Sequence, residues 1–78
     1  MYEEYKIFLG KHVKVERKLP SDIRPFKYYG YLEKIVEDSG ILILKGRSGL
    51  GTIRIQDVIS IVEIEPNYPT KEVFGREG

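Results

Sequence analysis

Hydrophobic and polar residues alternate with a period of two over several short stretches of the chain. From Lys11 to Glu16, valines alternate with charged residues, which predicts a first β-strand. Tyr28–Val36 is rich in β-branched and aromatic residues and contains Gly30, and a glycine inside a strand typically marks a sharp bend. Three further short strands are predicted at 41–44, 52–55 and 58–65. Five short strands and a bend glycine predict an all-β domain, a small five-stranded SH3-like barrel.

The segments between these strands carry turn and helix signals. Tyr2–Leu9 has apolar residues at helical spacing and is followed by Gly10, which predicts one short N-terminal helix. Prolines predict a loop over 19–27, and 37–40 is predicted to be a hairpin turn. Lys45–Gly51 contains three glycines and is expected to be a flexible turn, while Gln56–Asp57 predicts a one-turn corner. The domain is expected to span 1–66, with a flexible tail at 67–78.

The last predicted strand is apolar on both of its faces. Ile59 and Ile61 are expected on one face, and Val58, Val62 and Ile64 on the other. The second face therefore needs a cover from the helix, the tail or another subunit. We expect a homo-oligomer in which the fourth strand of one subunit pairs with the fifth strand of the next, because a closed ring would cover both edges.

Composition narrows the class of protein. Seventy-eight residues make one domain, and the absence of cysteine excludes disulfides and thiolate metal sites. His12, the single histidine, is expected at the surface, and neither a metal nor a cofactor is predicted. No apolar run approaches the ~20 residues of a membrane helix, so we expect a cytoplasmic protein without a membrane partner. The net charge of +1 allows a local basic patch, and ten isoleucines with many Lys and Glu residues resemble thermophile composition.

The order of the elements resembles that of the Sm-like (Sm/LSm) family of small β-barrels. Phe8–Val15 is similar to the family's passage from helix to first strand, and the first family motif matches Gly30 and Ile41–Ile43, together with Leu32 and Ile35. The second motif, Ile-Arg-Gly followed by apolar residues, is matched by Ile53–Arg54 and then Val58 and Ile61. The resemblance covers residues 5 to 65 and implies a ring-forming protein that binds RNA.

The positions that contact RNA in that family differ in this chain. Its Asp, aromatic and Asn residues fall on Val36, Asp38 and Gly40, and the glycine after the arginine is Ile55. Only Arg54 is retained, at a position whose arginine helps to hold nucleobases in the family. A base pocket needs a flat side chain and an amide or carboxylate. The standard uridine-type pocket is therefore expected to be missing.

One cluster interleaves basic and aromatic residues: Arg24, Phe26, Lys27, Tyr28, Tyr29 and Tyr31. This pattern suits single-stranded nucleic acid, whose bases stack on aromatic rings, or an aromatic-lined peptide groove. Alternatively, these tyrosines pack inward or against a neighbouring subunit. Gly46–Gly51 favours a plain hairpin over a phosphate-binding loop because a strand, not a helix, follows it. Lys45 and Arg47 could nevertheless contact phosphates there.

Two functional hypotheses follow. The first is a divergent, ring-forming Sm-like protein that binds RNA or other single-stranded nucleic acid through a non-standard surface. The residues expected to carry this binding are Arg54, Lys45, Arg47, Arg24, Lys27 and Tyr29. The second is an SH3-like protein-interaction or assembly module without nucleic-acid binding. We do not expect an enzyme, because the sequence offers neither a pair of acids for acid–base chemistry nor a nucleophile with triad partners.

Overall fold

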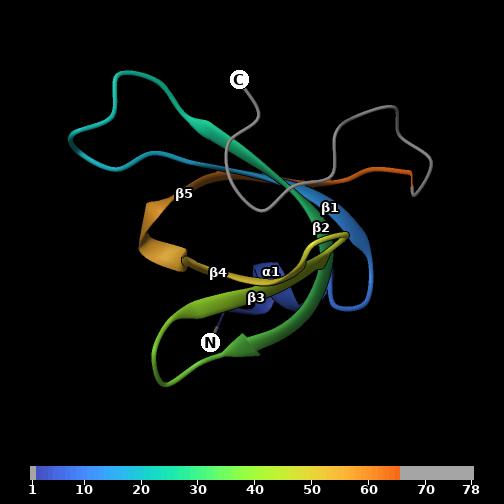
Figure 1. Cartoon of the computed structure of the whole chain (residues 1–78). Coiled ribbons are helices and arrows are strands. Elements are labelled where there is room, and N and C mark those ends of the chain that lie inside the picture. Colours follow the sequence, from blue (N-terminus) through green and yellow to red (C-terminus); the bar gives the residue numbers. More distant parts are fainter. Residues whose placement is uncertain (1, 66–78) are drawn as a thin grey trace.

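The computed structural model describes residues 2–65, which form one short helix and five strands (Figure 1). The elements are α1 (Glu3–Lys6), β1 (His12–Arg17), β2 (Phe26–Val36), β3 (Ile41–Gly46), β4 (Gly49–Arg54), the 3₁₀ turn η1 (Ile55–Asp57) and β5 (Val58–Glu63). The strands form one antiparallel sheet in the order β4-β3-β2-β1-β5. The predicted small all-β domain with an N-terminal helix is confirmed, and the bent sheet is compatible with an SH3-like barrel. The tail predicted at 67–78 lies outside the described residues.

The hydrophobic core lies inside the bend of the sheet. Its buried members are Val13, Val15, Leu32, Leu42, Leu44 and Ile53, which come from β1 to β4. Side chains of β5 and of the N-terminal segment, including Tyr5, Phe8, Val58 and Ile61, pack against this cluster. Each fully buried aliphatic side chain stabilises the fold by about 1.5–3 kcal/mol. The core therefore joins α1 and all five strands.

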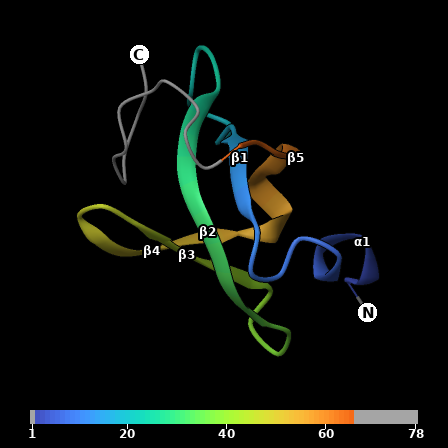
Figure 2. The ribbon, with the colours of Figure 1, turned by 90° about the vertical axis from the view of Figure 1, so that its right-hand side faces the viewer.

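β2 is strongly curved (Figure 2), and the backbone of Gly30 within this strand comes close to β3. A Cβ atom added at Gly30 would lie 2.8 Å from the carbonyl oxygen of Lys45 and 3.1 Å from its carbonyl carbon. A β-bulge between Leu32 and Lys34 adds a second irregularity to the same strand. A side chain at position 30 would therefore clash with the backbone of β3.

The N-terminal helix is shorter than predicted. It ends at Lys6 instead of Leu9, and the chain then turns onto β2. Gly10 has a left-handed φ of 79° and donates a hydrogen bond of 2.8 Å to the Leu32 carbonyl. In return, the Leu32 N–H donates to the Lys11 carbonyl over 3.0 Å. These contacts with the sheet replace further helical turns, which are marginal in so short a segment.

The prediction of a flexible turn over Lys45–Gly51 is wrong. Only Arg47 and Ser48 form the turn, because β3 continues to Gly46 and β4 begins at Gly49. Lys45 pairs with Leu50, and Gly46 with Gly49, so ladder pairing continues up to a two-residue hairpin. The Gly49 φ of 126° shows the left-handed freedom that this turn requires.

The predicted faces of β5 are also wrong. Val58 pairs with Arg17 and Ser60 with Glu16, so Ile59 is an extra residue in a β-bulge. The bulge shifts the alternation, and both Val58 and Ile61 pack against the core. Ile59 is left 56% exposed and Val62 41% exposed.

Candidate nucleic-acid interface

Basic side chains gather on the outer face of the sheet, opposite the core. Residues that pair across strands share a face, and the strand register places on this face Lys14, Lys27, Lys34, Lys45 and Arg54. Among the residues of β1 to β4 that pair across strands on this face, only Glu16 is acidic. The outer face therefore carries an excess of positive charge although the whole chain is nearly neutral.

One row of residues crosses this outer face from strand to strand. His12 pairs with Tyr31, Tyr31 with Lys45, and Lys45 with Leu50. The Tyr31 side chain is 41% exposed and that of Leu50 is 67% exposed, and Lys45 lies between them. An accessible ring beside an ammonium group is a combination that can stack a base and contact its phosphate.

The ring of Tyr31 is supported by His12. Their ring centroids are 4.8 Å apart and the planes are inclined by 52°. His12 is 4% exposed, and its Nδ1 donates a hydrogen bond of 3.2 Å to the Glu65 carbonyl. The expectation that His12 lies at the surface is therefore wrong, because the chain after β5 holds the imidazole against the sheet. The buried imidazole of His12 therefore packs against one side of the Tyr31 ring.

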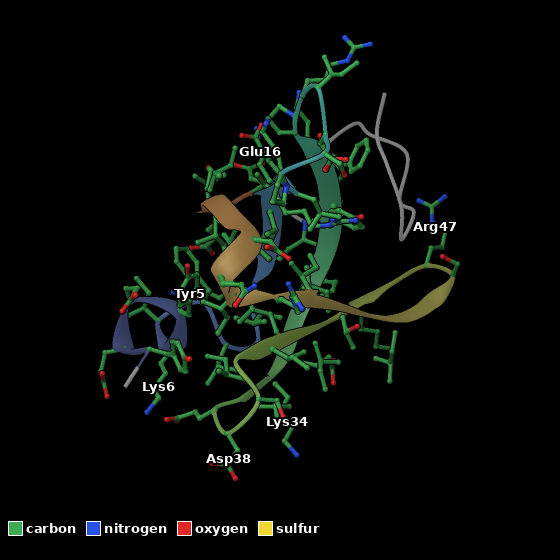
Figure 3. All side chains as sticks on the ribbon, turned by 90° about the vertical axis from the view of Figure 1, so that its left-hand side faces the viewer. Tyr5, Lys6, Glu16, Lys34, Asp38 and Arg47 are labelled. Atoms are coloured by element: carbon green, nitrogen blue, oxygen red, sulfur yellow. The ribbon has the colours of Figure 1, made fainter. Side chains whose placement is uncertain are left out.

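Other predicted residues of the interface occupy different environments. Tyr29 lies on the outer face but is only 5% exposed, so its ring is closed to a stacking base. Lys27 is half-buried on the same strand, and Arg24 is exposed in the loop before it. Arg47 lies at the tip of the β3–β4 hairpin, where Figure 3 shows its side chain extended into solvent. Of the predicted set, Lys45 lies beside the accessible ring, Tyr31.

Arg54 lies at the opposite end of the β3–β4 hairpin from Lys45 and Arg47. It pairs with Ile41, whereas Lys45 is four residues further along β3. The structure therefore does not bring these three cations together as one loop cluster. Arg54 is instead engaged by Asp57, whose Oδ2 lies 3.4 Å from the arginine Nε.

The surroundings of Arg54 are the positions where the family resemblance places its base pocket. The Ile55 N–H donates to the Gly40 carbonyl over 2.8 Å, so the 37–40 turn and η1 are neighbours. The turn carries Glu37 and Asp38, and Glu37 forms a 3.0 Å ion pair with Lys6 that raises the lysine pKa. Lys6 and Arg54 are each paired with a carboxylate at this end of the sheet, which makes it less favourable for a phosphate backbone.

Sequence reasoning missed the contacts of Arg17. Its guanidinium carbon lies 5.5 Å from the ring centroid of Phe26 and 5.2 Å from that of Tyr28. Arg17 also donates from Nε and Nη2 to the Tyr28 hydroxyl, at 3.1 and 2.6 Å. Tyr28 and Phe26 therefore serve packing at the end of the β1–β2 hairpin. The signal for this cluster is the register of the β1–β2 hairpin, which pairs Arg17 with Phe26.

Comparison with family models, with curated proteins and with solved structures found no match for this chain. Within residues 2–65, no helix is long and apolar enough to cross a membrane. The same residues contain no group of three or more His, Cys, Asp or Glu side chains that could hold a metal ion. The candidate interface thus depends on the geometry of the outer face alone.

Proposed function

We propose that this protein is a divergent member of the Sm-like family that binds single-stranded RNA on the outer face of its sheet. The observation that carries this proposal is the accessible Tyr31 ring beside Lys45, on a face where basic residues outnumber acidic ones. A base stacks on Tyr31, for about 1–3 kcal/mol, and the lysines neutralise the neighbouring phosphates. The face offers little hydrogen-bonding to base edges, so binding is tolerant of sequence.

Ring assembly is part of the same proposal and is supported by the strand order. β4 and β5 are the two edges of the sheet, so each has one side without a strand partner among the described residues. Unpaired edges are templates for adding another strand. Pairing β4 of one subunit with β5 of the next covers both edges in a closed ring and repeats the basic face around it.

Binding to homopolymeric single-stranded RNAs over a series of salt concentrations tests the RNA proposal. Lys45→Ala weakens binding to all homopolymers by similar factors and reduces the salt slope by about one. Tyr31→Ala weakens binding with the slope unchanged, whereas Tyr31→Phe retains the stacking ring and the affinity. Lys18→Ala removes an exposed lysine beyond the end of β1 and serves as the charge-matched control.

Two results would contradict the RNA proposal. Tight, uridine-selective binding that is lost on Arg54→Ala would place the site at the 37–40 turn. No salt-sensitive binding to any single strand would favour the protein-interaction module. That alternative is supported by the exposed apolar side chains Ile7, Ile23 and Ile59, which suit contacts between proteins.

A further inference from the structure

The loop between β1 and β2 presents an isoleucine at the surface. Ile23 is 96% exposed, the largest exposed fraction among the large apolar side chains of residues 2–65. The loop is held in place locally: the Leu19 N–H donates to Asp22 Oδ2 and the Asp22 N–H to the Leu19 carbonyl, both over 2.9 Å. A hydrogen bond of 3.0 Å from the Lys18 N–H to the Asp57 carbonyl anchors its start. A preformed loop loses little entropy on docking.

An open apolar groove lies elsewhere on the same chain. It has a volume of about 410 Å³ and runs between α1 with the turn that follows it and the first half of β5. Its lining residues are Glu4, Tyr5, Ile7, Phe8, Val58, Ile59, Ser60 and Ile61. Ile7 and Ile59 are 65% and 56% exposed, so they form an apolar patch at the mouth of the groove.

Charge distinguishes the groove from the loop. Glu4 lines the groove. Burial raises the pKa of the Tyr5 hydroxyl, and the Glu4 carboxylate raises it further. Ile23 is flanked by Asp22, whose carboxylate accepts the hydrogen bond from the Leu19 N–H, and by Arg24, which is exposed. A loop that inserts its isoleucine between α1 and β5 can bring the Arg24 guanidinium close to the Glu4 carboxylate.

We propose that Ile23 of one copy of this chain docks into the groove between α1 and β5 of a second copy, with Arg24 facing Glu4. Ile23 is 96% exposed, so it does not occupy the groove of its own chain. The loop that carries Ile23 and the groove are different surfaces, so the contact is head-to-tail. Each subunit supplies its loop to one neighbour and its groove to another.

This contact is separate from RNA binding and from strand pairing. The bulge at Ile59 interrupts the ladder at the start of β5, so an added strand would pair along Ser60–Glu63. Of the β5 residues that line the groove, Val58 and Ile59 lie outside this segment and remain open to the loop of a neighbour. The docking therefore does not rest on the function proposed above.

Sedimentation equilibrium in the absence of RNA, at protein concentrations from about 1 to about 200 µM, tests the docking. Ile23→Asp is expected to raise the dissociation constant of the assembly about tenfold or more, since it removes the central apolar anchor. Ser21→Asp adds the same charge to the same exposed loop and is expected to change it less than about threefold. Both positions are exposed, so neither change threatens the fold.

A charge exchange gives the more specific result. Arg24→Glu and Glu4→Arg each weaken association, and the double variant restores it to within about threefold of wild type because the pair is re-formed in reverse. A wild-type protein that is monomeric throughout the range overturns the proposal. Equal effects of Ile23→Asp and Ser21→Asp, or no recovery in the double variant, also overturn it.

Discussion

Replacing Gly30 with alanine tests the close approach of β2 to β3. The added Cβ would lie 2.8 Å from the Lys45 carbonyl oxygen, 3.1 Å from its carbonyl carbon and 3.5 Å from the Gly46 nitrogen. These are backbone atoms of a paired strand, so they cannot rotate away as a side chain would. Overpacking of this kind costs about 1–3 kcal/mol. A loss of about 2 kcal/mol lowers the melting temperature of a domain of this size by roughly 8–16 °C.

Thermal and urea unfolding followed by circular dichroism measure this change. Glu33→Ala, at an exposed position of the same strand, is the control and is expected to stay within about 0.5 kcal/mol of wild type. If Gly30→Ala unfolds within the same margin, β2 and β3 do not approach as closely as the structure has them. The account of this close approach would then be refuted.

Three further substitutions probe the core, an ion pair and the sheet edge. Leu44→Ala removes a fully buried side chain and is expected to cost about 2–5 kcal/mol in urea unfolding, whereas Leu50→Ala, on the adjacent strand but 67% exposed, is expected to cost less than about 0.5 kcal/mol. The Glu37 carboxylate raises the pKa of Lys6 above its ordinary 10.5, so the pair's contribution to stability is present below that pH and is lost as the pH rises through the folded-state pKa. Glu37→Gln should lower the Lys6 pKa in an NMR titration; an unchanged value would deny the pair. Val62→Lys places a charge on β5 and is expected to dissociate the assembly in sedimentation experiments, unlike the conservative Val62→Thr.

The main features of the fold were predictable because they follow from periodicity and turn chemistry. Alternation predicted β1, the glycine predicted to be special within β2 is found in close approach to β3, and the Gln56–Asp57 corner is found as η1. The errors arose where tertiary contacts outweigh local signals. The glycines after Lys45 belong to paired strands, and the bulge at Ile59 changes which face of β5 is buried.

The candidate site was less predictable, since burial and register decide which side chains are accessible. Composition pointed to the β2 aromatics, but no local signal distinguishes the buried Tyr29 from the accessible Tyr31. Lys45 and Arg54 are nine residues apart in sequence but lie at opposite ends of one hairpin. They are separated because the β3–β4 ladder runs from the Ile41–Arg54 pair to the Gly46–Gly49 pair. The sequence predicts a flexible turn in place of the last pairs of this ladder.

NMR titration of the ¹⁵N-labelled protein with a single-stranded RNA oligonucleotide is the sharpest test of RNA binding, because it reports where on the sheet the RNA lies. If RNA binds the outer face, the amides of Tyr31, Lys45 and Leu50 shift most, and these shifts diminish as salt is raised. Shifts confined to the 37–40 turn and Arg54, or no shifts at low salt, would contradict the RNA proposal.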